Sequence, residues 1–168
     1  LKRTAQAALA EALQPFENQN FTATERLDDG HTISVKVEVS QQEVQLDFAG
    51  TSGVHPQNLN ANLSIVFSAI LYVLRLLCQK DIPLNEGLMQ KVQIHLPTSF
   101  LNPDFEDDPE QCPAVVGGNT EVSQRLVDTL IKAFDLSACS QGTMNNFLFG
   151  NNKFGYYETI GGGCGAGE

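Results

Sequence analysis

The residues best suited to chemistry lie in five loops that are rich in Gly, Asn, Gln, Ser and Thr. These loops span residues 50–53, 58–61, 117–121, 140–146 and 161–163. Glycine lets the backbone approach a ligand closely, and amide side chains offer both hydrogen-bond donors and acceptors. The loops therefore suit a small polar, uncharged group such as an imide or a lactam. The alternative is that each glycine only permits a tight turn.

A polar stripe adds charged groups to this set. Glu121, Gln124, Arg125 and Asp128 are spaced i, i+3, i+4 and i+7, which places them on one face of a predicted helix. Arg125 can bind a carboxylate through two parallel hydrogen bonds. Glu121 can pair with Arg125 or take part in proton transfer. The glycines before this helix predict free N–H groups that bind an anion. The stripe can also be read as an ordinary solvated helix face.

Residue chemistry within these segments gives a specific set of expected site residues. We expect Glu121, Arg125 and Glu158 to be catalytic. The residues expected to contact the substrate are Asn119, Ser140, Gln141, Thr143, Asn145, Asn146 and Gly162.

The histidines and cysteines form no recognisable catalytic or metal-binding motif. His31 and His95 fall on strand positions and are expected to be structural, whereas His55, in a Gly/Pro loop, is the one histidine considered for a site. The four cysteines contain no C-x-x-C pair, which argues against a zinc ribbon or a redox dithiol. We expect Cys78 to be a buried thiol, and Cys139 and Cys164 are possible nucleophiles.

The net charge of the chain limits the classes of partner that it is expected to bind. The 168 residues carry 10 Lys+Arg and 20 Asp+Glu, a formal net charge of −10. Nucleic-acid binders supply basic residues to phosphates, and membrane-surface proteins often carry polybasic clusters. We therefore expect neither nucleic acid nor membrane as a partner. The acidic run 104–110 is expected to be a solvated loop, with a hard-cation site as the alternative.

Hydrophobic periodicity predicts an α+β fold in which a mixed, mainly antiparallel sheet packs with two principal helices, at about 62–79 and 119–135. Residues 63–78 are apolar enough to predict a helix that is buried on nearly all sides. Ile33, Val35, Val37 and Val39 alternate with polar residues and predict a half-buried strand. The other predicted elements are a helix over 2–14 and strands over 21–27, 43–48, 91–96, 147–149 and 153–159.

Six runs of residues carry a family resemblance. They span 46–52, 58–61, 81–87, 116–125, 140–146 and 156–163. In composition and order they resemble the hydantoinase B/5-oxoprolinase family. That family is much longer than this chain, so we expect residues 1–168 to be a single segment of a larger B-type domain, truncated at both ends.

The resemblance implies ATP-dependent hydrolysis of a cyclic amide, such as a hydantoin or 5-oxoproline, after phosphorylation of the amide oxygen. It implies a hydantoinase A-type subunit or fused domain that binds ATP with magnesium. The family's metal-binding motif lies upstream, so we expect a divalent metal there and none within this segment. We also expect a cytoplasmic, oligomeric full-length enzyme and no activity from the segment alone. Two alternatives stay open: an acetone/acetophenone carboxylase-type alpha subunit, and a non-catalytic module that assembles with the A-type partner.

Overall fold

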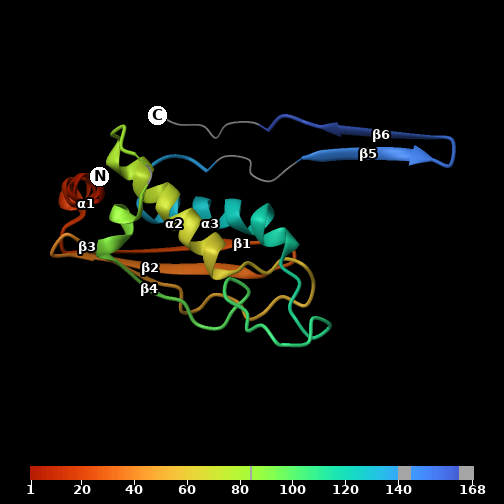
Figure 1. Ribbon diagram of the computed structural model, residues 1–168, viewed down its shortest axis with the longest axis horizontal. Coiled ribbons are helices and arrows are strands. Elements are labelled where there is room, and N and C mark those ends of the chain that lie inside the picture. Colours follow the sequence, from red (N-terminus) through yellow and green to blue (C-terminus); the bar gives the residue numbers. More distant parts are fainter. Residues whose placement is uncertain (84, 140–144, 163–168) are drawn as a thin grey trace.

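The computed structural model describes residues 1–83, 85–139 and 145–162, and its main body is a four-stranded sheet covered by helices (Figure 1). The strands lie in the order β1 (Gln19–Arg26), β2 (Thr32–Ser40), β3 (Glu43–Asp47) and β4 (Val92–His95). The helices are α1 (Lys2–Leu13), α2 (Leu63–Cys78) and α3 (Glu121–Ala133). Short 3-10 turns cover Gln14–Phe16 (η1), Glu86–Lys91 (η2) and Val116–Asn119 (η3). A separate hairpin is formed by β5 (Asn146–Asn151) and β6 (Phe154–Thr159).

The sheet follows the predicted alternation closely. Ile33, Val35, Val37 and Val39 of β2 are all buried. Strand β2 pairs antiparallel with β1 and β3, and β4 pairs parallel with β3. The predicted mixed, mainly antiparallel sheet is therefore confirmed.

Helices α2 and α3 lie across one face of this sheet (Figure 1). Helix α2 lies in the connection from β3 to β4, as a parallel pair requires. Its first turn is capped by Asn62, whose Oδ1 accepts the N–H of Ile65 at 3.1 Å. Leu46 of β3, Leu74 of α2 and Leu130 of α3 are each about 1% exposed, so the core lies between the helices and the sheet.

Helix α2 is buried only on its inner face. Leu63, Phe67, Tyr72 and Leu76 point outward and are 41–54% exposed. The prediction that this helix is buried on nearly all sides is therefore wrong for these 168 residues. The error has a physical reason, because apolarity shows that a face suits burial and does not show what covers it.

The β5–β6 hairpin extends away from the helices and the sheet (Figure 1). Every side chain of the two strands is exposed. No helix within the described ranges has the length and apolarity needed to cross a bilayer.

Substituting two leucines of α2 tests the assignment of the core. Leu74 is 1% exposed and Leu76 is 44% exposed. We expect Leu74→Ala to lower the free energy of unfolding by about 2–5 kcal/mol, because it leaves a cavity in the core. Leu76→Ala in the same chain is the control, with an expected loss below about 1 kcal/mol. Urea unfolding followed by circular dichroism measures both, and equal losses would contradict the assignment.

Candidate functional site

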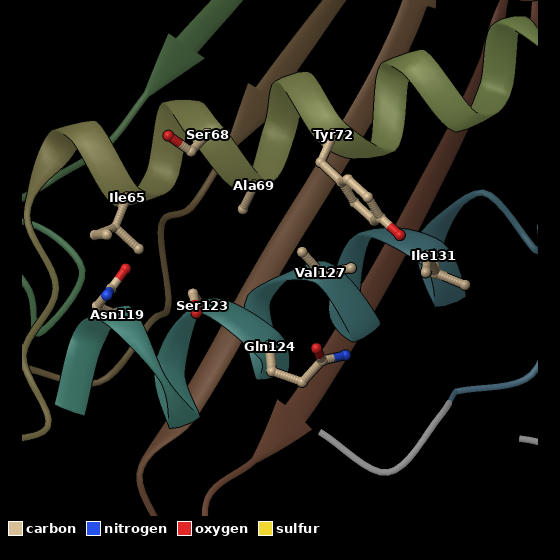
Figure 2. A pocket seen from close by; sticks show the side chains of 9 residues that line it. All are labelled: Ile65, Ser68, Ala69, Tyr72, Asn119, Ser123, Gln124, Val127 and Ile131. Atoms are coloured by element: carbon tan, nitrogen blue, oxygen red, sulfur yellow. The ribbon is translucent and has the colours of Figure 1, made fainter. Parts of the chain in front are cut away.

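A pocket of about 430 Å³ lies between α2 and α3 (Figure 2). Its lining combines apolar side chains with hydroxyl and amide groups. Helix α2 contributes Ile65, Ser68, Ala69 and Tyr72; the opposite wall, from η3 and α3, contributes Asn119, Ser123, Gln124, Val127 and Ile131. Figure 2 shows the Asn119 side chain pointing toward Ile65 and the Tyr72 ring extending toward Ile131. The pocket can hold a small ligand that has both apolar and hydrogen-bonding parts.

Gln124 links this pocket to a buried carboxyl. Its Nε2 donates to Asp128 Oδ1 at 3.1 Å. Asp128 is 3% exposed, and burial raises the pKa of its carboxyl above the usual value. The stripe on α3 is therefore not a fully solvated face, because one of its four members lies inside the molecule.

Arg125 and Glu121 form the ion pair that their spacing predicts. Arg125 Nη2 donates to Glu121 Oε1 at 3.1 Å, and both side chains are about one-third exposed. Among the described residues, Arg125 Nε is the one buried side-chain nitrogen or oxygen without a hydrogen-bond partner. This N–H is enclosed by the protein, and neither Arg125 nor Glu121 is among the residues that line the pocket.

Gly117 and Gly118 do not form the predicted anion site. The Gly117 N–H donates to Asn58 O at 2.7 Å, and the Gly118 N–H donates to Val115 O at 3.0 Å. These amides are thus already satisfied within the protein. A Cβ at Gly117 would lie 2.6 Å from Leu59 Cδ2, and one at Gly118 would lie 2.6 Å from Ala61 Cα. The two glycines are needed for close packing against the 58–61 loop.

Asn60 holds this packing in place from the other side. It is fully buried, and its Oδ1 accepts the N–H of His55 at 2.7 Å. Its Nδ2 lies 3.0 Å from His55 O, 3.1 Å from Gln57 O and 3.0 Å from Ala114 O. Asn60 therefore fastens the 55–60 loop to the segment that leads into η3 and Asn119.

Sequence reasoning missed a cluster of Asp29, His31 and His55. Asp29 Oδ2 lies 3.0 Å from His31 Nδ1 and 2.5 Å from His55 Nε2, and Asp29 Oδ1 accepts the His31 N–H at 3.0 Å. The two imidazole rings lie 4.4 Å apart. These hydrogen bonds, led by the one from the His31 backbone, lower the pKa of Asp29 to about 2. Asp29 and His31 are 2 positions apart in the chain and His31 and His55 are 24 positions apart, and this spacing does not predict a cluster.

Asp29, His31 and His55 have the residue types and proximity of a metal site, with one ligand atom from each lying within 4.8 Å of the others. The hydrogen bonds assign a different role to His55. The Gln57 N–H donates to His55 Nδ1 at 3.0 Å, so in the neutral ring the proton lies on Nε2 and points at Asp29. His55 Nε2, which faces the cluster and would have to bind the metal, therefore carries a proton and has no free lone pair. His55 is 4% exposed and acts here as a structural histidine that fixes its loop to Asp29.

The expected hairpin residues lie apart from the pocket. Asn146 Oδ1 accepts the Tyr157 hydroxyl at 2.9 Å, and Glu158 Oε2 accepts the Tyr156 hydroxyl at 2.8 Å. In the described ranges no hydrogen bond or ion pair joins Asn145, Asn146, Glu158 or Gly162 to Asn119, Glu121 or Arg125. Ser140, Gln141, Thr143 and Cys164 lie outside the described residues.

The described candidate cysteines have raised rather than lowered pKa values. Burial raises the pKa of Cys78, and burial followed by the nearby Asp128 and Glu25 charges raises that of Cys139. A reactive cysteine needs the thiolate at neutral pH. The environment of Cys139 therefore argues against it as a nucleophile, and Cys78, which is 5% exposed, is the buried thiol that the sequence predicts.

Comparison with known proteins gives consistent relatives. The family described as hydantoinase B/oxoprolinase matches residues 1–168. The chain is 47% identical over 144 residues to 5-oxoprolinase 1 of Arabidopsis thaliana, a match that covers 84% of this chain and 11% of that protein. It is 43% identical over 173 residues to 5-oxoprolinase of Saccharomyces cerevisiae, covering 95% of this chain and 13% of that protein. The chain thus spans little more than a tenth of these relatives.

A solved structure shares the fold. The ATP-dependent caprolactamase from Pseudomonas jessenii matches with a TM-score of 0.68 and 20% sequence identity. The match covers 94% of this chain and 29% of the caprolactamase chain. At this identity the likeness shows the fold alone, and it confirms the predicted α+β architecture.

Acid titration tests the Asp29 cluster. The pKa of Asp29 falls from 3.8 to about 2 on folding, so the carboxylate contributes stability above pH 3.8 that is lost as the pH drops toward 2. We expect Asp29→Asn to flatten the dependence of unfolding free energy on pH in this window. Urea unfolding at several pH values measures the slope, with Asp28→Asn as the neighbouring control. A slope unchanged by Asp29→Asn would contradict the hydrogen-bonded cluster.

A methyl group at Gly118 tests the packing that positions Asn119. We expect Gly118→Ala to lower the free energy of unfolding by about 1–3 kcal/mol, because the new Cβ collides with the backbone of residues 60–61. Gly53→Ala is the matched control, since nothing lies within 4 Å of its Cβ position. Thermal unfolding measures both variants. If Gly118→Ala were as stable as Gly53→Ala, the close approach would not constrain the fold.

Proposed function

This chain belongs to the hydantoinase B/oxoprolinase family, and from that membership we propose that it is a segment of the B-type region of an ATP-dependent hydrolase that opens a small cyclic amide. The names of its relatives support this proposal. Two are 5-oxoprolinases, and the protein that shares the fold is an ATP-dependent caprolactamase.

The proposed reaction follows from the low reactivity of amides. Transfer of a phosphoryl group to the amide oxygen creates a leaving group at a carbon that water otherwise attacks slowly. We place ATP and magnesium on a hydantoinase A-type subunit or fused domain, and a divalent metal on a region outside this segment. The residues of this chain would bind and orient the ring during its opening.

The pocket between α2 and α3 is the observation that carries the proposal. Asn119 and Gln124 each offer an amide that can donate to a ring carbonyl and accept from a ring N–H, and Ser123 adds a hydroxyl. Ile65 and Val127 supply apolar surface for ring methylene groups. The volume of about 430 Å³ falls within the range of about 300–1,000 Å³ typical of small-molecule sites.

We also propose that Arg125, which follows Gln124 on α3, binds the carboxylate or phosphate of the substrate through the exposed part of its guanidinium. Glu121 would hold the guanidinium in position through their ion pair. The proposed substrate contacts also include Asn145, Asn146 and Gly162, in and beside the hairpin, together with Ser140, Gln141 and Thr143. Glu158 would then serve in proton transfer.

Substitution of Arg125 in the complete enzyme tests this function. We expect Arg125→Ala to lower kcat/KM for ATP-dependent ring opening by about 10–100-fold, the value of one charge-assisted hydrogen-bond pair. Arg125→Lys should recover only part of this loss, because lysine keeps the charge without the planar fork. Product release from 5-oxoproline, hydantoin and caprolactam provides the assay.

The control for this experiment is Arg3→Ala, which removes an exposed arginine of α1. It should leave kcat/KM unchanged. If Arg125→Ala behaved in the same way, the role of Arg125 would be rejected. If the complete protein opened none of these rings in the presence of ATP, the proposed reaction would be rejected.

A further inference from the structure

The outward face of α2 has the character of a core surface. We define this outer face as Leu63, Ser64, Phe67, Ser68, Tyr72 and Leu76, all of them exposed. The whole helix carries a single charged residue, Arg75. Helix α1 differs, because its exposed residues include Lys2, Arg3 and Glu11. The chain therefore places charge on a helix face that meets water and omits it from the outer face of α2.

The Ser68 side chain of this face is compatible with a dry contact. The Ser68 hydroxyl donates to Ser64 O, one turn earlier in the helix, at 2.8 Å. A hydroxyl with an internal partner does not lose a hydrogen bond when water is removed. A helix that is apolar on all sides is typically buried on all sides. The outer face is thus suited to burial against another apolar surface.

We propose that the outer face of α2 is covered by a further part of the same polypeptide, from outside these 168 residues. The inference rests on the proposed function, in which this chain is a segment of a longer B-type region. The lengths of the related proteins favour a segment of the same chain, rather than a separate subunit, as the covering surface. In the caprolactamase the matched fold takes up 29% of one continuous chain, and in the plant and yeast 5-oxoprolinases this segment corresponds to 11% and 13% of the protein. The same fold is therefore accompanied by much more covalently linked chain.

The composition of the face favours the same occupant. Covalent linkage holds two surfaces at high effective concentration. Permanent contacts are more apolar than transient ones. The surfaces of transient contacts keep polar and charged groups because they are also exposed to water. An uncharged face with Leu63, Phe67 and Leu76 fits a permanent contact within one chain.

Covering the outer face would also complete the pocket. Ser68 and Tyr72 belong to the outer face and line the pocket between α2 and α3. A segment seated over Tyr72 would close the open side of this pocket and limit the access of water. The substrate site would then be formed jointly by residues 1–168 and by the part of the polypeptide that covers α2.

The hairpin presents a second surface with the same property. The rings of Phe147, Phe149, Phe154 and Tyr156 form one aromatic face, with centroid distances from 4.9 to 6.5 Å, and all four are 44–53% exposed. An isolated two-stranded hairpin is only marginally stable in water.

Cysteine labelling tests the proposal directly. Phe67→Cys places a thiol on the outer face of α2, and Leu76→Cys places a second one a little over two turns away. Ala7→Cys, on the exposed side of α1, is the matched control. The rate of reaction with a maleimide is measured at each site by mass spectrometry of the digested protein, for the complete polypeptide in its folded state and for the same polypeptide unfolded in urea.

We expect labelling at positions 67 and 76 to be about tenfold or more slower in the folded polypeptide than in the unfolded one, because a buried site reacts only after local opening. Labelling at position 7 should be similar in both. Equal rates at 67 and 76 in the two states would overturn the proposal. Protection that depends on protein concentration, which indicates a second copy, or that appears only after an A-type subunit is added, would also overturn it. Because labelling needs no turnover, its failure is distinguishable from a failure of the proposed reaction.

Discussion

The close contact between the 58–61 loop and Gly117–Gly118 determines where α3 begins. Two backbone segments approach here so closely that neither glycine can carry a side chain without displacing its neighbour. Asn60 fixes the same contact by bonding to Ala114 O, and His55 anchors the loop to Asp29. Asn119 follows immediately, so its position opposite α2 depends on this contact. The pocket is thus a product of loop packing as much as of the two helices that form its walls.

Local patterns predicted much of the fold. The alternation of Ile33, Val35, Val37 and Val39 places β2 because strand side chains alternate between two faces, and the structure buries all four. The Glu121–Arg125 pair follows in the same way from helical spacing. Both predictions depend only on residues close in sequence, which is why the sequence was sufficient for them.

Features that depend on tertiary packing were not predictable. The glycines at 117 and 118 predict an anion site from sequence alone, because the sequence cannot show that their amides are bonded to Asn58 O and Val115 O. Asp29, His31 and His55 converge through the turn between β1 and β2 and the loop after β3. The pocket combines Asn119 and Gln124 with Tyr72 through the packing of α3 on α2. The family resemblance implies a class of reaction, and it does not indicate which of these side chains meet.

The parallel pairing of β3 with β4 has a consequence for the order of folding. Strands β1, β2 and β3 follow one another through short turns, so their pairing closes only small loops. Val44 pairs with Val92 only after the chain has passed through the long loop and all of α2. Closing so large a loop costs more entropy than forming a hairpin, so contacts between distant residues form slowly. Loop-closure entropy therefore favours pairing within the three-stranded meander before the short edge strand β4 joins it.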